Sequence, residues 1–430
     1  MSDPARGTEA LSTQYNDMTR ASRGLMLLLL SLSYFLSYFD RLLMAVVGEL
    51  VKQEFVLSDK ALSLLTGAAF VVIYGVFGIV SGWLVDRFNR KRILAGALLL
   101  WSAVTAACGA AQSFVQLALA RAGVGIGEAA NVPAAISMIS DMYPPAKRPM
   151  AIAIFYAGGM VGILACFVVG TWVAGHFGWR AAFLVAGPPG VVLSVLIAVF
   201  GREPARERAL QQSQESTAQH SSFRLVMRDR ALLWLLTGGA VATFINMGVV
   251  QWLPNFFMRS HNLSVAQVGV FFGPVLAAGM TAGMLLGGWL GNRVAERSVV
   301  NLIWLSIATM LAIIPLYVLM LLVPSLPIAL AATFVGTAAS VIYAPSYNAA
   351  WQTICHPRAR GTAAGISGCA NALIGGALGT FVVGLMSDAW LPAFGKDSLR
   401  YALIASMSFC LIAAALFMHA ARIVAKNQTA

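Results

Sequence analysis

Twelve long apolar stretches recur along the sequence, and they constrain the fold more than any other feature. Most reach the roughly 20 residues that an α-helix needs to cross the hydrocarbon core of a bilayer. In lipid, backbone polar groups must be satisfied within the protein, so such stretches form helices. The sequence therefore predicts an all-α polytopic membrane protein with twelve transmembrane helices, at about 24–50, 62–86, 93–113, 115–141, 149–175, 180–200, 231–258, 266–292, 299–322, 326–351, 360–387 and 398–421.

The composition agrees with a membrane protein. Only 11% of the residues are charged, against about 25% in soluble domains. The formal net charge of +12 does not indicate nucleic-acid binding, because the basic residues lie in short segments between apolar stretches. With the N-terminus inside, cytoplasmic segments hold 21 Lys and Arg residues and external segments hold 6. This asymmetry predicts a multi-pass protein of the cell membrane with both termini cytoplasmic.

A polar, Gln- and Ser-rich segment divides the twelve helices into six and six. We expect a cytoplasmic tail (1–23), a six-helix bundle (24–200), a cytoplasmic linker (201–229), a second six-helix bundle (231–421) and a second tail (422–430). The halves repeat, because Gly-Trp-Leu-Val-Asp-Arg at 82–87 returns as Gly-Trp-Leu-Gly-Asn-Arg at 288–293. This offset of 206 aligns Asp40 with Asn246 and predicts two pseudo-symmetric bundles.

Away from the ends of the predicted spans, four charged residues remain, all in the first half. Asp40 and Arg41 are adjacent in the first span, and Arg121 and Glu128 lie in the fourth, about two turns apart on one face. The two helices run in opposite directions, which puts Asp40 at a depth close to that of Arg121. Charges at this depth are costly and usually mark a transport pathway. We expect Asp40, Arg121 and Glu128 to share one buried network.

A buried carboxylate binds a proton readily unless a cation pairs with it. If Arg121 pairs with Asp40 or Glu128 in one conformation and releases it in another, the released acid takes a proton, which is proton coupling. The alternative is a permanent salt bridge kept for specificity. Arg121 or Arg41 is also suited to bind an anionic head group.

Neutral polar and aromatic residues are the remaining candidates for a substrate site. The second half supplies no charge deep within the membrane, so it would contribute hydrogen bonds and aromatic walls. Each residue singly has the alternative of only bridging helices. With few paired polar groups, this set suits an amphipathic anion better than a sugar. The candidates are Tyr34, Tyr38, Asn131 and Tyr156 in the first half, and Asn246, Tyr343, Asn348 and Asn371 in the second.

A motif rich in basic residues (82–92) covers the end of the second span and the loop that follows it. Gly82 would let a neighbouring helix approach closely, and Asp86 can accept hydrogen bonds from a facing helix end. Asn89, in the turn that follows the span, tolerates a left-handed backbone conformation. The motif is a candidate conformational latch; the alternative is a signal for topology alone. The latch candidates are Gly82, Asp86, Arg87, Arg90 and Lys91.

The motif at 82–92 resembles the loop between helices two and three of the major facilitator superfamily. Tyr-Phe-Asp-Arg at 38–41, Gly-Glu-Ala at 127–129 and Ser-Asp-Met-Tyr-Pro at 140–144 narrow the resemblance to a bacterial-type homologue of the Spinster branch. Eukaryotic members export sphingosine 1-phosphate or move lysophospholipids, and bacterial members are proton-coupled. The resemblance implies that Asp40, Arg41, Arg121 and Glu128 are the coupling and head-group residues.

These observations predict a proton-coupled secondary transporter that works by alternating access and moves an amphipathic or lipid-like anion. The alternatives are a proton symporter that imports small organic or sugar acids, a hydrophobic drug efflux pump, and a receptor that has lost transport. No metal-ligand cluster or nucleophile–base pair stands out in the sequence, so we expect no enzyme activity, catalytic residue, metal or cofactor. The expected partners are the substrate, protons and the bilayer, with the protein a monomer that binds no nucleic acid.

Overall fold

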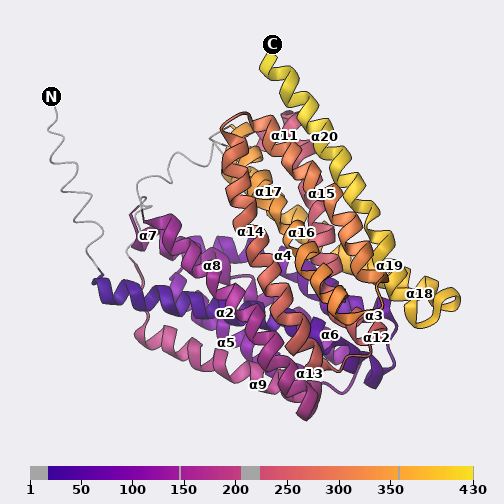
Figure 1. Ribbon diagram of the computed structural model, residues 1–430. Coiled ribbons are helices and arrows are strands. Elements are labelled where there is room, and N and C mark those ends of the chain that lie inside the picture. Colours follow the sequence, from indigo (N-terminus) through magenta and orange to yellow (C-terminus); the bar gives the residue numbers. More distant parts are fainter. Residues whose placement is uncertain (1–17, 145–146, 205–222, 357–358, 430) are drawn as a thin grey trace. The chain divides into compact units, whose positions relative to one another are not determined.

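The computed structural model describes residues 18–144, 147–204, 223–356 and 359–429. Most of the predicted N-terminal tail (1–17) and the centre of the predicted linker (205–222) lie outside the described residues. The described chain is built from helices (Figure 1). It contains ten helical segments long and apolar enough to cross a membrane.

Two of these segments are long enough to cross twice. Met150–Phe200 has 51 residues and Thr362–Lys426 has 65, and at about 1.5 Å per residue each exceeds twice the roughly 30 Å of a hydrocarbon core. Each breaks at a glycine with positive φ, Gly178 (φ 82°) in the first and Gly395 (φ 56°) in the second. The left-handed region favours glycine because it has no Cβ. Eight single and two double segments give the twelve predicted crossings.

The chain forms two compact units. The first contains residues up to Met44 together with Ile73–Gln212. Within it, Arg90–Cys108 (α5) packs against Thr171–Phe200 (α9) and Phe114–Glu128 (α6). A π-helical turn (Cys166–Gly170) joins Arg148–Ala165 (α8) to α9. The helices that contribute to this unit are α2 (Arg20–Phe55), α4 (Ala69–Arg87), α5 (Arg90–Cys108), α6 (Phe114–Glu128), α7 (Asn131–Met142), α8 (Arg148–Ala165) and α9 (Thr171–Phe200).

The second unit contains Ala45–Val72 and the described residues from Ser213 onward, so it includes the C-terminal end of α2 and the start of α4. α16 packs between α14 and α15, and α11 packs on α20. Its π-helical turns are Leu64–Ala68, Phe244–Val249, Val268–Phe272 and Asn371–Leu378, and its 3₁₀ turns are Val250–Trp252 and Gly395–Asp397. Its helices are α3 (Asp59–Ser63), α11 (Arg230–Thr243), α12 (Leu253–Ser260), α13 (Val265–Gln267), α14 (Gly273–Ala295), α15 (Val299–Leu322), α16 (Leu326–Ile354), α17 (Arg360–Ala370), α18 (Gly379–Phe394), α19 (Ser398–Ser406) and α20 (Ser408–Thr429).

Glycines set the closest helix contacts in the first unit. A methyl group on Gly127 of α6 would lie 2.7 Å from Trp101 Cβ of α5, and one on Gly162 of α8 would collide with the Phe35 carbonyl of α2. Small residues at such positions let membrane helices approach closely. The close approach predicted at Gly82 is absent in this structure, where a methyl group would meet no atom within 4 Å.

The turn before α5 differs from the expectation for Asn89. Its backbone is extended (φ −68°, ψ 112°) rather than left-handed. The side chain accepts a hydrogen bond of 2.9 Å from the Arg92 backbone N–H, which satisfies one of the free donors at the start of the helix. Asn89 is therefore the N-cap of α5.

Candidate functional site

Asp40 lies on α2 and is 3% exposed. Its Oδ2 accepts a hydrogen bond of 2.8 Å from the Thr105 hydroxyl of α5. Among the described residues it takes part in no ion pair within 4.0 Å. A neutral hydroxyl therefore holds a carboxylate that is shielded from water.

Glu128, at the end of α6, is fully buried and differs from Asp40 in its partners. Its Oε2 accepts hydrogen bonds from Ser37 Oγ at 2.9 Å and from Arg41 Nε at 2.7 Å. Its Oε1 has no hydrogen-bond partner among the described residues. The ion pair of this cluster is thus Arg41–Glu128.

Arg121, which lies on the same face of α6 as Glu128, is also fully buried. Its Nη1 donates to the backbone carbonyl of Asp40 at 3.5 Å. The structure therefore places the four intramembrane charges of α2 and α6 in one cluster, hereafter the Asp40 cluster (Asp40, Arg41, Arg121 and Glu128). Two acids and two bases balance, which such a buried group requires.

Aromatic rings surround the exposed side of this cluster. The Arg41 guanidinium lies 4.5 Å from the Tyr74 ring centre and 5.5 Å from that of Tyr38. Tyr34 contacts Tyr38 and Tyr156 with ring centres 4.9 and 5.3 Å apart. The Arg41 side chain is 24% exposed, whereas that of Glu128 is inaccessible. Arg41 is therefore the least buried charge of this cluster.

Asn131 has a packing role in this structure. It is 1% exposed at the start of α7. Its Oδ1 accepts a hydrogen bond of 2.8 Å from Ser33 Oγ, and its Nδ2 donates to the Ser33 carbonyl at 3.3 Å. The amide bridges α7 to α2.

The candidates of the second half belong to the second unit. Asn246 lies in the π-helical turn after α11 and donates from Nδ2 to the Ser340 carbonyl of α16. Tyr343 is buried on α16. Asn348 bonds within its own helix, donating to the Ala344 carbonyl at 2.8 Å. The Oδ1 of Asn371 is buried without a hydrogen-bond partner in the described chain.

The basic motif after α4 divides into an exposed and a buried part. Asp86 and Arg87 are exposed in the last turn of α4, and the Arg87 guanidinium lies 4.5 Å from the Trp83 ring centre. The second copy of the repeat shows the same contact, with Arg293 3.9 Å from Trp289. This shared local geometry agrees with the repeat seen in the sequence.

Arg90 is 1% exposed and belongs to a buried ion-pair network. It pairs with Asp141 at the end of α7, and its Nε donates to Glu203 Oε1 at 2.7 Å. The Lys91 backbone N–H donates to Glu203 Oε2 at 2.7 Å. These residues fasten the start of α5 to the ends of α7 and α9.

A second buried ionic cluster lies in the second unit, around Asp59 at the start of α3. The Arg259 guanidinium of α12 donates two hydrogen bonds of 2.7 Å to the Asp59 carboxylate. Its Nε donates a third, of 2.9 Å, to Glu49 Oε2. Lys52 Nζ lies 2.5 Å from Asp59 Oδ1. Ser387 donates to Asp59 Oδ2 at 2.6 Å, and Asp388 Oδ1 accepts from the Asp59 N–H at 2.7 Å. We call these six residues the Asp59 cluster.

Neither the Asp59 cluster nor several partners of the Asp40 cluster were predicted from the sequence. Lys52, in the last turn of α2, and Arg259, in the last turn of α12, are two of the six basic residues predicted in external segments. Thr105, Ser37 and Tyr74 lie in apolar stretches, where single hydroxyls are common. The sequence signal for the Asp59 cluster was the presence of acidic and basic residues close to the ends of the predicted helices.

Comparison with known proteins agrees with this architecture. Residues 30–380 match the family model of the Major Facilitator Superfamily. The chain is 32% identical over 373 residues to an MFS-type efflux pump of Mycolicibacterium smegmatis, covering 86% of this chain and 85% of that one. It is 27% identical over 300 residues to the hexuronate transporter of Escherichia coli K12, covering 65% of this chain and 68% of that one.

Among solved structures, it is similar to a bacterial homologue of the human lysosomal transporter Spinster in an inward-facing, unoccupied conformation. The TM-score is 0.87 at 29% identity, over 94% of this chain and 98% of that one. The protein is therefore not an enzyme but a transporter: it belongs to the Major Facilitator Superfamily, and its structure is similar to that of a Spinster homologue.

Proposed function

We propose that the protein is a proton-coupled secondary transporter that works by alternating access and moves an amphipathic or lipid-like anion. The observation that carries this proposal is the unequal pairing of two buried acids. Glu128 is held by Arg41, whereas Asp40 is held by a neutral hydroxyl. A carboxylate without a direct ion pair in a low-dielectric site favours its protonated form, which makes Asp40 the proton acceptor.

Arg41 links the proton to the substrate. The guanidinium pairs with Glu128 and lies against two tyrosine rings, and the Arg41 side chain is 24% exposed. Protonation of Glu128 removes the charge that holds Arg41 and frees it for an anionic head group. Because binding couplings are reciprocal, an anion on Arg41 then favours protonation of Glu128.

The aromatic residues favour an amphipathic ligand. Tyr38 and Tyr74 lie against the Arg41 guanidinium, and Tyr34 and Tyr156 extend this aromatic wall. A small organic or sugar acid, as the name of the Escherichia coli relative suggests, would use the arginine but not this apolar wall. A hydrophobic drug would use the wall but not the arginine.

The Asp59 cluster is the proposed latch of the side opposite the basic loops, which is the external side by the charge asymmetry. It joins the end of α2 and the start of α3 to α12 and α18, segments from both halves of the sequence. These contacts must separate when that side opens. The similarity to an inward-facing structure agrees with a closed external side.

Proteoliposomes with an imposed pH gradient test the proposal. We expect Asp40→Asn to abolish pH-driven uptake or export while the melting temperature stays unchanged, and Asp397→Asn, a partly exposed acid outside the Asp40 cluster, to leave transport intact. Transport by Asp40→Asn with the pH dependence of the wild type would contradict proton coupling through Asp40. Thermal shifts with lysolipids, sphingoid phosphates, small carboxylates and sugar acids identify the substrate class; stabilisation by the small acids alone would favour the alternative.

A further inference from the structure

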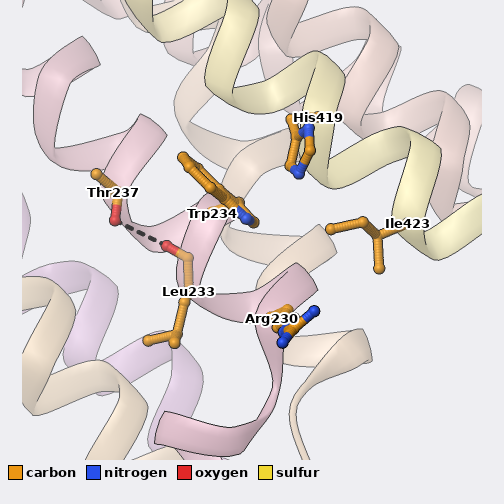
Figure 2. A pocket seen from close by; sticks show the side chains of 6 residues that line it. All are labelled: Arg230, Leu233, Trp234, Thr237, His419 and Ile423. Carbon is orange, nitrogen blue, oxygen red and sulfur yellow. Dashed lines mark hydrogen bonds between the residues drawn. The ribbon is translucent and has the colours of Figure 1, made fainter.

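A cavity of about 680 Å³ opens between the first turns of α11 and the last turns of α20 (Figure 2). None of the residues proposed for transport lines it. Its wall combines one permanent cation, one imidazole and one indole with apolar and hydroxyl groups. The lining residues are Arg230, Leu233, Trp234, Thr237, His419 and Ile423.

The helical spacing orders these groups by depth. Arg230 is the first residue of α11, and Trp234 and Thr237 follow on the same face at one and two turns. On α20, Ile423 lies one turn nearer the chain end than His419. The Trp234 and His419 rings meet edge to face, with centres 4.8 Å apart. The cavity therefore has a cation at the end near the start of α11, hereafter its mouth, and aromatic and apolar groups further along the helices.

The surroundings of the mouth are basic. Arg224 and Arg228 precede α11, and Arg422 and Lys426 lie on the last turns of α20, all exposed. The acid beside Arg230, Asp229, is directed to its own helix, where it caps the Leu232 N–H at 3.0 Å. Arg230 forms no hydrogen bond or ion pair with the described residues, so its guanidinium is available to an anion.

These features match the bilayer interface. Tryptophan is enriched at the level of lipid head groups, and basic pockets between helices on the cytoplasmic side bind acidic head groups. Trp234 is 39% exposed here, one turn from the basic end of α11. A free phosphate would use Arg230 alone and leave the Leu233 and Ile423 side chains without a partner.

We propose that this cavity binds one acidic phospholipid from the leaflet that faces the basic loops. The head-group phosphate pairs with Arg230, the His419 imidazole and Trp234 indole contact the glycerol region, and an acyl chain lies along Leu233 and Ile423. This assignment is independent of the substrate and of proton coupling.

Binding to the delipidated full-length protein in detergent tests the proposal. Dioleoyl-phosphatidylglycerol is expected to raise the melting temperature, while dioleoyl-phosphatidylcholine and inorganic phosphate are not. Arg230→Gln should weaken phosphatidylglycerol binding by about tenfold or more, the value of a lost charge-assisted hydrogen bond. Arg228→Gln is the matched control from the same basic segment and should bind as the wild type does.

A second readout places the lipid. Brominated phosphatidylglycerol should quench part of the tryptophan fluorescence, and that part should vanish in Trp234→Phe. The proposal is overturned by equal stabilisation with phosphatidylcholine, by equal stabilisation with phosphate, by equal losses in Arg230→Gln and Arg228→Gln, or by unchanged quenching in Trp234→Phe. Because Arg230 and Trp234 are exposed, both variants are expected to fold.

Discussion

Replacing Arg259 by glutamine should open the side of the protein that the Asp59 cluster closes. The guanidinium makes bonds of 2.7 Å to both oxygens of Asp59 and of 2.8 and 2.9 Å to Glu49. Side-chain exposures are 12% for Arg259, 13% for Glu49 and 4% for Asp59. The cluster is thus mostly desolvated, and its arginine cannot be treated as a surface charge.

The magnitude follows from what the variant leaves behind. Breaking a buried pair costs about 3–5 kcal/mol, because one charge stays buried without its partner. Asp59 keeps Lys52 at 2.5 Å and Ser387 at 2.6 Å, so the lower end applies. About 3 kcal/mol against the closed form corresponds to a roughly 100-fold shift toward the open form.

Cysteine accessibility measures this shift. Asn255, one turn before Arg259 on α12, is 1% exposed. In a Cys369→Ser background, which removes the exposed cysteine, Asn255→Cys should react slowly with an impermeant maleimide. Arg259→Gln should raise that rate by up to about 100-fold, since the rate follows the open population.

Arg400→Gln is the control. Arg400 pairs with Asp397 at 3.2 Å in a partly exposed i,i+3 contact, which is worth about 0–1 kcal/mol. Unchanged labelling in Arg259→Gln, or an equal rise in both variants, would refute the assignment of the Asp59 cluster as a latch.

Four further predictions follow from single contacts. Gly162→Val should lower the melting temperature in detergent, because the added carbons meet the Phe35 carbonyl at a cost of about 1–3 kcal/mol; Gly82→Ala, with open space, should not. Arg90→Gln should destabilise by about 3–5 kcal/mol by leaving Asp141 and Glu203 unpaired, and an unchanged melt would contradict the buried network. Tyr74→Leu should weaken binding of an anionic substrate, measured by thermal shift, because Arg41 loses its nearer aromatic ring; equal binding would show that the ring does not position Arg41. Burial and the nearby Arg400 lower the pKa of His261, so folding favours the neutral imidazole. Its contribution to the stability of the fold is therefore present above the ordinary histidine pKa of about 6.5 and is lost as the pH falls below it. His261→Gln should reduce the loss of stability between pH 7 and 5.

The sequence predicted the helices well because lipid admits few structures. Apolar length alone located the spans. Asp40, Arg121 and Glu128 could be placed near one another because helix rise converts sequence position into depth. The choice of partner could not be predicted. That Glu128 pairs with Arg41 rather than Arg121 depends on helix rotation, which sequence spacing does not fix.

The Asp59 cluster was missed for a different reason. Its members come from segments around 49–59, 259 and 387–388, more than 100 residues apart, and each carries a charge at a helix end, where charges are ordinary. Helix length predicts where such residues leave the membrane, but not which of them meet. Asn89 shows the same limit on a smaller scale, since a residue that tolerates a left-handed turn is also a good N-cap.

Helix α2 carries members of both charged clusters. Arg41 and Glu49 are eight residues apart on one continuous helix, which is about 12 Å along its axis. The helix contributes its residues up to Met44 to the first unit and those from Ala45 to the second. In the proposed function, a change at Arg41 when Glu128 takes a proton or an anion binds therefore acts on the same helix that presents Glu49 to Arg259 and Lys52 to Asp59. If α2 moves as one body, opening the Asp59 cluster and changing the partner of Arg41 are a single event, and neither Arg259→Gln nor Glu128→Gln should alter one site without shifting the population of the other.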